Sequence, residues 1–502
     1  MATIPNWLHQ RAYLTPNRLA LKFGKQRWTF RELDQRVDWV ARRLAGLGIE
    51  EGSRIALLMR NSPDFAMMVH AVTRIGAMLI PLNIRLTPTE IAWQVADAEA
   101  NALIYDESNT STAGLIAQHL PKLQLVSTNG DPIGNAIALN EAPDTHVSLL
   151  DDVDLSAVHS IIYTSGTTGK PKGALLSYNN LWWSASGSAF NLGVHNDDVW
   201  LAVLPLFHVG GLSILIRSVI YGNTAIIHQS FDPAAVNRSI DEDRVSIISV
   251  VSTMLQRMLD ERGDKPYPST LRCVLLGGGP APRPLLETCA ARNIPVVQTY
   301  GLTETSSQIA TLPPEDALRK LGSAGKPLFP SELRIEDDGR QLLAGEVGEI
   351  VVRGPTVSAG YIEPLDSTIK KPNGGWLRTG DLGYLDDEGY LYVVSRRNDL
   401  IISGGENIYP AEVEAVLLAH PAVEEVGVIG VPDAEWGQAP AAAIKVRAGK
   451  DVSPEELYAF CEARLAHFKI PAHFWFVEWL PRNASGKLLR PMLAEDWQKH
   501  HP

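Results

Sequence analysis

The segment from Ile161 to Gly173 has a composition that suits the binding of a polyphosphate. Ile161-Ile162-Tyr163 leads into ten residues that hold three glycines, two lysines and four hydroxyl side chains. Glycine lets backbone N–H groups turn toward an anion, hydroxyls donate further hydrogen bonds, and lysine supplies positive charge. The run predicts a phosphate-binding loop after a buried strand, formed by Thr164, Ser165, Gly166, Thr167, Thr168, Gly169, Lys170 and Lys172.

The spacing of this run differs from that of a Walker loop. A Walker loop has four residues between its first glycine and the Gly-Lys pair, and then Ser or Thr. Here only two threonines separate the first two glycines, and Pro171 follows Lys170. The run is therefore either a phosphate loop of another kind or a solvated turn, and its length favours the phosphate loop.

Strand and helix patterns alternate along the first part of the chain and must position this loop. Thr29-Phe30-Arg31-Glu32 has the form of a capping box, and apolar residues then recur at helical spacing from Leu33 to Leu44. Such alternation predicts an α/β fold of helix-flanked, mainly parallel sheets. Further helix starts are expected at Ser62-Pro63 and Thr87–Glu90, and strands at Arg54–Met59, Ala102–Tyr105, Val245–Val251 and Arg272–Leu276.

The last hundred or so residues have a different pattern, and about 100 residues are enough for a small α+β domain. Charged and polar residues interrupt two apolar runs near Ser395–Asp399. The domain boundary is therefore expected there. Within this part we expect strands at Val426–Val431 and His473–Leu480, and helices from Pro410 to about Ala419 and after Ser453-Pro454-Glu455-Glu456; the strand Tyr390–Val394 precedes the boundary.

Composition excludes several classes of protein. The chain has 502 residues, 45% hydrophobic and 20% charged, and a formal net charge of −12, so nucleic acid and anionic membranes are disfavoured as main partners. The three cysteines are too few for a disulfide framework or a metal cluster, which predicts buried, reduced thiols. No signal peptide or membrane-spanning segment is expected, because Arg74 and Arg217 break the longest apolar stretches. These features predict a cytoplasmic protein, and a homodimer is compatible with them.

The run from Ile161 to Gly173 resembles the signature of the adenylate-forming superfamily, which includes acyl-CoA synthetases, adenylation domains and luciferases. Four more segments resemble motifs of that superfamily and occur in its order, so the resemblance covers essentially the whole chain. They are Tyr300–Thr305, Trp376–Asp381, Gly404–Pro410 and Pro481–Lys487.

The resemblance implies which residues contact ATP and magnesium. Tyr300, Gly301 and Thr303 would contact adenine, together with Gly278 and Gly279, while Asp381 and Arg396 would reach the ribose. Glu304 and Thr168 would hold Mg²⁺, and Lys487 would be the catalytic lysine. These residue types suit a reaction that converts a carboxylate into a mixed anhydride with AMP, because negative charge then develops on the phosphates.

The resemblance also implies a chain of two domains joined by a hinge. Residues 1–395 would form the adenylation core, 396–399 the hinge, and 400–502 a mobile domain carrying Lys487. Gly404 and Gly405 would turn inward when CoA reacts. Asn398 stands where many relatives have Asp or Lys, and it is the candidate pivot because asparagine tolerates unusual backbone angles.

Two segments are most similar to those of ligases that act on o-succinylbenzoate. They are Pro5–Ala12 and Leu204–Ser213, and Thr303–Gln308 fits the same subgroup. His208 would then lie at the acyl pocket near the entry of the thiol, with Gly277 lining it; a histidine satisfied inside the core is the alternative. This acid has a second carboxylate on its ring, and the candidates to hold it are Arg217, Ser306 and Ser307. The alternatives are that Arg217 lies on a helix surface and that the serines cap a turn.

The sequence therefore predicts an ATP-dependent acid–CoA ligase that forms an acyl-adenylate, then a CoA thioester, releasing AMP and pyrophosphate. The favoured acid is o-succinylbenzoate, and a medium-chain fatty or aryl acid is the alternative. Loading of a carrier protein is disfavoured because no carrier-like domain is expected after residue 502. A catalytically silent nucleotide-binding protein is disfavoured because both Glu304 and Lys487 are present.

Overall fold

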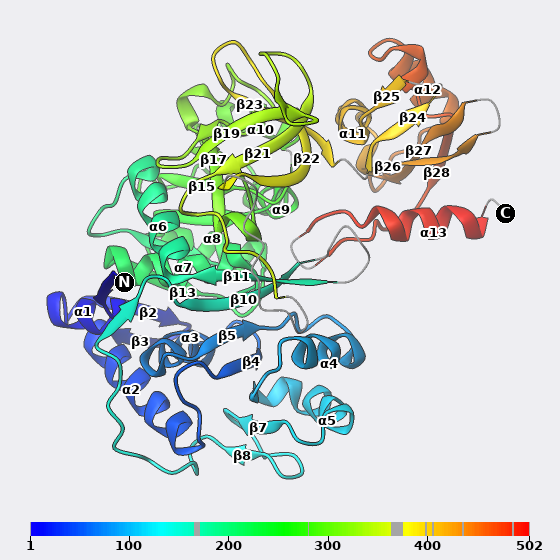
Figure 1. Cartoon of the computed structure of the whole chain (residues 1–502). Helices are drawn as coiled ribbons and strands as arrows, with labels where there is room; N and C mark the ends of the chain where they lie inside the picture. Colours follow the sequence, from blue (N-terminus) through cyan, green and yellow to red (C-terminus); the bar gives the residue numbers. More distant parts are fainter. Residues whose placement is uncertain are drawn as a thin grey trace.

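The structure is a computed structural model, and it describes residues 2–164, 171–279, 281–362, 375–396, 399–403, 406–433, 436–483 and 486–500. The side chains of residues 396, 406, 407 and 500 lie outside this description. Figure 1 shows a large body, built from the chain up to β23, and a smaller body formed by α11, α12, α13 and β24–β28. The two bodies meet on one side of the large one.

The first sheet of the large body is parallel except at one edge. Its strand order is β11-β10-β5-β4-β6-β7-β8, and β11 pairs antiparallel to β10. Chain order therefore runs from β4 outward to both sides, and helices connect β4 to β5, β5 to β6 and β6 to β7. Its strands are β4 (Arg54–Leu58), β5 (Met78–Pro81), β6 (Ala102–Tyr105), β7 (Gln124–Ser127), β8 (Ile137–Ala138), β10 (Val158–Thr164) and β11 (Lys172–Ser177), and the nearby helices are α1 (Trp7–Leu14), α2 (Phe30–Gly46), α3 (Pro63–Ile75), α4 (Pro88–Asp97) and α5 (Thr110–His119).

The second sheet has a parallel centre with antiparallel strands at both ends. Its order is β18-β17-β16-β15-β14-β12-β13-β2-β3. One buried apolar cluster joins it to the first sheet, with side chains from α2, α3 and α7 and from strands of both. The strands are β2 (Leu19–Phe23), β3 (Gln26–Thr29), β12 (Val199–Ala202), β13 (Thr224–Ile227), β14 (Ile247–Val250), β15 (Cys273–Leu276), β16 (Val296–Leu302), β17 (Ser307–Leu312) and β18 (Lys326–Pro327), and the helices are α6 (Tyr178–Leu192), α7 (Val209–Tyr221), α8 (Pro233–Glu242), α9 (Ser252–Arg262) and α10 (Arg283–Ala291).

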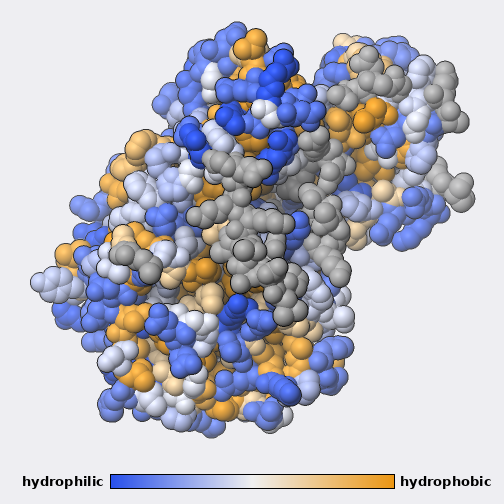
Figure 2. All heavy atoms as spheres, in the orientation of Figure 1, coloured by the Kyte–Doolittle hydropathy of each residue, from blue (hydrophilic) through white to orange (hydrophobic). Residues whose placement is uncertain are grey.

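A third sheet is antiparallel throughout; the sequence predicted only its last strand, expected at Tyr390–Val394 and found at Leu391–Arg396. Its order is β20-β19-β21-β22-β23. Short turns join most of its strands, so no helix is needed between them. Figure 2 shows hydrophilic side chains over much of its visible face. Its strands are β19 (Glu332–Asp337), β20 (Arg340–Gln341), β21 (Gly348–Arg353), β22 (Leu377–Leu385) and β23 (Leu391–Arg396).

The smaller body packs helices against a sheet of order β26-β27-β28. A short β24–β25 pair precedes that sheet, and the body has its own buried apolar clusters. This confirms the small α+β unit expected from the sequence. Its elements are β24 (Ile401–Ser403), β25 (Glu406–Ile408), α11 (Pro410–Leu418), β26 (Val423–Asp433), β27 (Gly437–Val446), α12 (Pro454–Glu462), β28 (His473–Phe476) and α13 (Arg490–His500).

Local sequence signals fixed most helix starts correctly. Thr29, Thr87 and Ser453 each accept a hydrogen bond from the N–H three residues on, while the glutamate there binds the cap N–H. The strand expected to run to Leu480 ends at Phe476, whose pairing with Ile444 of β27 is the last in this ladder. The strand expected over 426–431 extends to 423–433, where both flanks pair with β27.

The three cysteines are buried and free, as expected. Burial raises the pKa of the Cys273 thiol to about 12, which keeps it protonated and unreactive. Within the described ranges, no helix is both long and apolar enough to cross a bilayer.

Candidate active site

Glu304 lies at the centre of a group of polar side chains from three separate segments. It sits in the short turn after β16, and its Oε1 accepts a 2.7 Å hydrogen bond from the Tyr361 hydroxyl. The Thr164 hydroxyl, at the end of β10, is 3.4 Å from the same oxygen. The carboxylate is thereby aimed at the start of the predicted phosphate loop.

Tyr361 is a member of this group that the sequence did not reveal. Burial, and then the adjacent Glu304 charge, raise the pKa of its phenol, so the hydroxyl remains a donor. The Lys172 ammonium lies 5.5 Å from the centre of its ring. Tyr361 also pairs with Ala174 in an isolated bridge, which brings the segment after β21 to the edge strand β11. No motif surrounds this tyrosine, so only the folded chain identifies it.

The turn that carries Glu304 has a constrained backbone. A Cβ at Gly301 would lie 1.7 Å from the carbonyl oxygen of Ser307, so only glycine fits. Ser306 and Ser307 have φ values of 54° and 95°, which residues other than glycine rarely adopt. The Thr305 hydroxyl holds the turn through a 2.9 Å bond to Ser307 O. Strain of this kind collects at functional turns, where the surrounding structure enforces it.

Tyr300 and Asp381 connect this strand to the third sheet. The Tyr300 hydroxyl donates a 2.7 Å hydrogen bond to Asp381 Oδ2, and Asp381 is 6% exposed. Asp381 pairs in register with Arg396 across β22 and β23. The structure therefore brings the predicted adenine and ribose residues to one place.

The glycines at 277–279 lie beside this group because the strands run in parallel. β14, β15 and β16 are neighbours, so their carboxyl ends share one edge of the second sheet. Gly277–Gly279 follow β15, and the turn with Glu304 follows β16. Ligands of open α/β sheets bind at this edge.

The turn that carries Lys487 reaches the same sheet edge from the smaller body. Lys487 N donates 2.9 Å to Asn483 Oδ1, and Asn483 N donates 2.8 Å to Lys487 O. A Cβ on Gly486 would lie 3.1 Å from Val251 Cγ2, the residue that directly follows β14. The structure thus places this turn against the end of a strand in the candidate site.

His208 is mostly buried at the start of α7, and its position depends on Asn61. Asn61 accepts from Leu206 N at 2.9 Å and donates to Leu204 O at 2.9 Å, which fixes the loop before the histidine. Burial, with Arg85 as a lesser cause, lowers the pKa of His208 to about 4, so its ring is neutral at physiological pH. Its Nε2 has no hydrogen-bond partner among the described residues. The sequence did not identify Asn61, which no motif marks.

Arg217 is enclosed in the core rather than exposed on its helix, so the alternative of a surface arginine was wrong. It is 2% exposed and donates 3.0 Å to Ser184 Oγ, which donates 2.6 Å to Ser306 O. Burial lowers its pKa from the ordinary value. The guanidinium thus lies two hydrogen bonds behind the Ser306–Ser307 turn.

Several predicted site residues lie outside the described residues, and the structure neither places nor tests them. They are Ser165, Gly166, Thr167, Thr168, Gly169 and Lys170 of the phosphate loop, Asn398 of the hinge, Gly404 and Gly405, and the side chain of Arg396.

The described side chains suit one metal ion held jointly with a ligand. No group of three His, Cys, Asp or Glu residues that could hold a metal occurs in the described part of the chain. Mg²⁺ commonly binds one or two carboxylates and completes its shell with water and substrate phosphates. Glu304, with the Thr164 hydroxyl beside it, fits that pattern.

Comparison with known proteins identifies the family. The sequence model of the AMP-binding enzyme matches residues 8–362, and that of the AMP-binding enzyme C-terminal domain matches residues 412–487. The chain belongs to the AMP-binding enzyme family. The first matched region lies within the large body of Figure 1, and the second lies within the small body.

Several relatives about half identical to this chain over nearly their full length are named 2-succinylbenzoate–CoA ligase. The chain is 53% identical to 2-succinylbenzoate–CoA ligase of Geobacillus kaustophilus, covering 98% of this chain and 97% of the relative. It is 49% identical to the ligase of the same name from Bacillus cytotoxicus, covering 99% of both chains. Among solved structures, o-succinylbenzoate CoA synthetase (MenE) from Bacillus subtilis in complex with the acyl-adenylate intermediate OSB-AMP matches with a TM-score of 0.90, 45% identity and 98% coverage of both chains.

Proposed function

We propose that this chain is an ATP-dependent o-succinylbenzoate–CoA ligase. ATP and the acid would first give o-succinylbenzoyl-AMP and pyrophosphate, and CoA would then displace AMP to give the thioester. The convergence of Glu304, the Tyr300–Asp381 pair and the Lys487 turn at one sheet edge carries the reaction class. The full-length similarity to 2-succinylbenzoate–CoA ligases supports the acid.

Adenylation needs groups that stabilise charge on the α-phosphate and on the departing pyrophosphate. Bound Mg²⁺ would supply Lewis acidity at the phosphate oxygens, held by Glu304 with Thr164 and Thr168 as hydroxyl neighbours. Lys487 would place its ammonium near the reacting acyl and phosphate oxygens. Asp381 would accept hydrogen bonds from the ribose, with Tyr300 fixing its orientation. A solved structure of the Bacillus subtilis synthetase in complex with ATP and magnesium ion supports this assignment, at a TM-score of 0.89.

The phosphates would contact the loop between β10 and β11. Thr164 and Lys172 flank it within the described residues, and Lys172 is exposed and near Tyr361. We assign Ser165 to Lys170 to the same role. The adenine would lie by Gly278, Gly279, Gly301 and Thr303 at the ends of β15 and β16.

The acid would be bound between the His208 loop and the Ser306–Ser307 turn, with Gly277 at its wall. Its aliphatic carboxylate reacts, so its ring carboxylate stays ionised and needs donors or positive charge. Ser307 lies at the turn surface and would donate to it, while the enclosed Arg217 would act through Ser184 and Ser306. Neutral His208, with an unpartnered Nε2, would line the entry of the thiol.

The smaller body would rotate about residues 396–399 between the two half-reactions, with 1–395 and 400–502 as the moving units. Lys487 and the Gly404–Gly405 segment belong to one small body yet would serve different steps. A comparison supports this. The Bacillus subtilis synthetase matches this chain with a TM-score of 0.90 in complex with its acyl-adenylate but 0.75 as a double mutant bound to a product analogue.

The cytoplasm, which contains ATP and CoA, is the proposed location. The proposed reaction is compatible with a homodimer as well as with a monomer. Light scattering coupled to size-exclusion chromatography distinguishes the two states.

The test is a pyrophosphate-release screen over carboxylic acids, each with and without CoA. The proposal requires release with o-succinylbenzoate, formation of its CoA thioester, and loss of both in Glu304→Gln. Release with octanoate or benzoate but not with o-succinylbenzoate would assign the chain to the fatty or aryl acyl-CoA synthetases. No release with any acid would leave a silent nucleotide-binding protein.

A further inference from the structure

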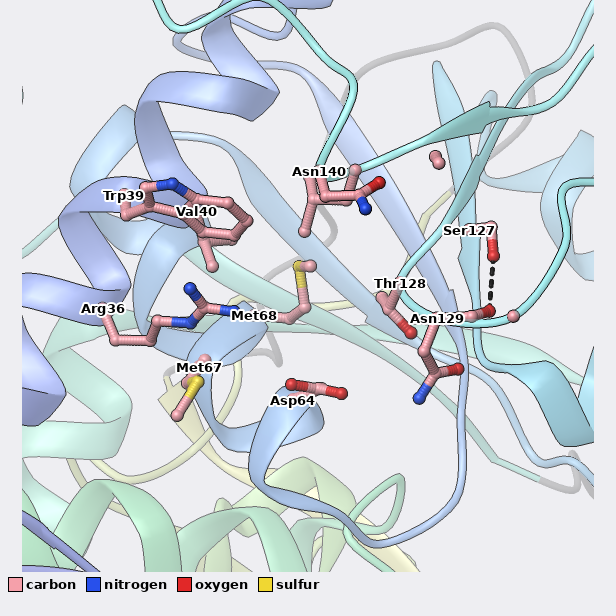
Figure 3. A pocket seen from close by; sticks show the side chains of 13 residues that line it. Arg36, Trp39, Val40, Asp64, Met67, Met68, Ser127, Thr128, Asn129 and Asn140 are labelled. Atoms are coloured by element: carbon pink, nitrogen blue, oxygen red, sulfur yellow. Dashed lines mark hydrogen bonds between the residues drawn. The ribbon is translucent and has the colours of Figure 1, made fainter.

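A second pocket lies in the large body, lined by residues other than those of the candidate active site. It has a volume of about 300 Å³ and lies between α2, the start of α3 and the segments after β7 and β8. Figure 3 shows side chains from these elements around one hollow. Its lining includes Arg36, Trp39, Asp64, Met67, Met68 and Asn129.

The place of this pocket in the first sheet is one where ligands bind in other α/β proteins. The chain leaves β4 toward β5 on one side and leaves β6 toward β7 on the other. Connections that diverge in this way leave a crevice at the carboxyl ends of the strands. Asp64 follows β4 at the start of α3, and Asn129 follows β7, so both lie at that edge.

Two opposite charges face the pocket without pairing to each other. Among the described residues, Arg36 and Asp64 have no ion pair; the Arg36 guanidinium lies 4.0 Å from the centre of the Trp39 ring. Burial raises the pKa of Asp64; the charge of Arg36 opposes this rise, and nearby Asp106 adds to it. Asp106 is itself bonded to Arg60 N and Asn109 Nδ2, so it stays fixed. Arg36 and Asp64 thus act on each other across the hollow without forming an ion pair, and a ligand that carries both charges could bind each of them directly.

The walls of the pocket are held by contacts of their own. The Arg43 guanidinium lies 4.5 Å from the centre of the Trp39 ring, and Arg43 donates to Asn140 O at 2.7 Å. Asn129 O accepts 2.7 Å from Ser127 Oγ, and Asn129 Oδ1 accepts 2.8 Å from Glu107 N. The pocket is therefore formed before any ligand enters, which lowers the cost of binding.

The size and lining define the class of ligand. About 300 Å³ is at the lower end of small-molecule sites, which suits a ligand of amino-acid size. Met67 and Met68 are flexible apolar groups that adapt to varied side chains. We propose that this pocket binds a small zwitterion of the α-amino-acid class, with its ammonium at Asp64, its carboxylate at Arg36 and an apolar side chain against Met67 and Met68.

The segment that carries Asp64 also carries a residue that supports the candidate active site. Asn61, which holds the loop before His208, lies three residues before Asp64. The binding experiment is therefore run with the candidate active site saturated by AMP and o-succinylbenzoate. Binding of an amino acid is then measured only at the second pocket.

The test uses L-leucine and L-phenylalanine as probes, with saturation-transfer NMR for detection and calorimetry for affinity. Binding should weaken at least 10-fold in Asp64→Asn and in Arg36→Gln, and remain unchanged in Arg31→Gln, an exposed arginine of the same helix. N-acetyl-leucine, which lacks the ammonium, should bind at least 10-fold more weakly. Thermal melting verifies that each variant is folded.

Three results would overturn the proposal. They are no binding of either amino acid at 10 mM, equal binding in the wild type and in both folded pocket variants, and equal binding of N-acetyl-leucine. None of them bears on the ligase reaction, which is measured separately by pyrophosphate release.

Discussion

The Tyr361 hydroxyl donates a 2.7 Å hydrogen bond to Oε1 of Glu304, although 57 residues separate the two in the chain. This bond fixes the carboxylate against the end of β10, where Thr164 lies 3.4 Å from the same oxygen. A carboxylate held in one orientation offers the same oxygen to a metal ion in every turnover.

Tyr361→Phe should slow adenylation by about 10- to 100-fold, because a hydrogen bond to a charged group contributes about 1.5–3 kcal/mol. The loss should be accompanied by a higher magnesium concentration at half-maximal rate. Pyrophosphate release against magnesium concentration measures both. Tyr267→Phe removes a hydroxyl bonded to Asn237 far from the site and should leave the rate unchanged. A normal magnesium dependence in Tyr361→Phe would show that this hydrogen bond does not contribute to metal binding.

Lys487→Ala should separate the two half-reactions. Its ammonium would stabilise charge only while the adenylate forms, so adenylation should fall about 10²- to 10⁴-fold. Thioester formation from supplied acyl-adenylate should persist. Lys450→Ala, an exposed lysine of the same body, is the control. Equal losses in both half-reactions would show that Lys487 is not specific to one step.

Asn398→Pro should restrict rotation of the smaller body, since proline fixes φ and constrains the residue before it. We expect slower thioester formation or slower overall turnover. Rapid-quench assays of each half-reaction measure this, and Asn398→Ala, which leaves the backbone free, should retain the wild-type rates. Unchanged kinetics in the proline variant would place the pivot elsewhere.

Stability should fall in mild acid because of two buried histidines. Burial lowers the pKa of His70 to about 4 and of His159 to about 3 from 6.5. The unfolded chain therefore binds protons that the folded chain does not, from about pH 6.5 downward. Each histidine's contribution is complete above that pH and is lost by up to about 1.4 kcal/mol per pH unit as the pH falls toward the folded pKa.

Urea unfolding between pH 7 and pH 5 measures this loss. His159→Gln should flatten the fall in the urea midpoint, whereas His119→Gln, at an exposed position, should not. An unaltered slope in His159→Gln would assign the acid sensitivity to other groups.

The sequence predicted elements whose signals are local. The capping boxes at Thr29, Thr87 and Ser453 and the strand Ala102–Tyr105 depend on a few neighbouring residues, and the structure confirms them. The resemblance placed Glu304, Asp381 and Lys487 in one site, and the described geometry brings their segments to one sheet edge.

Contacts between distant segments could not be predicted from the sequence. Tyr361 and Asn61 act through single hydrogen bonds to residues far along the chain, and no spacing rule marks such partners. The burial of Arg217 likewise follows from how α7 packs against α6 and β12, with Ser184 and Trp200 as its neighbours. The antiparallel third sheet was missed, apart from its last strand, because turns rather than helices separate most of its strands, so the alternation of strand and helix that marked the other sheets is absent from it.

We expect the acid to be a dicarboxylate whose ring carboxylate the enzyme recognises. The decisive experiment compares kcat/KM for o-succinylbenzoate with that for benzoylpropionate, which lacks only the ring carboxylate, and for octanoate. We predict a preference of at least ~10-fold for the dicarboxylate, about 1.4 kcal/mol, which shrinks in Ser307→Ala and in Arg217→Ala where that variant is folded. Equal or better turnover of benzoylpropionate or octanoate would contradict the account.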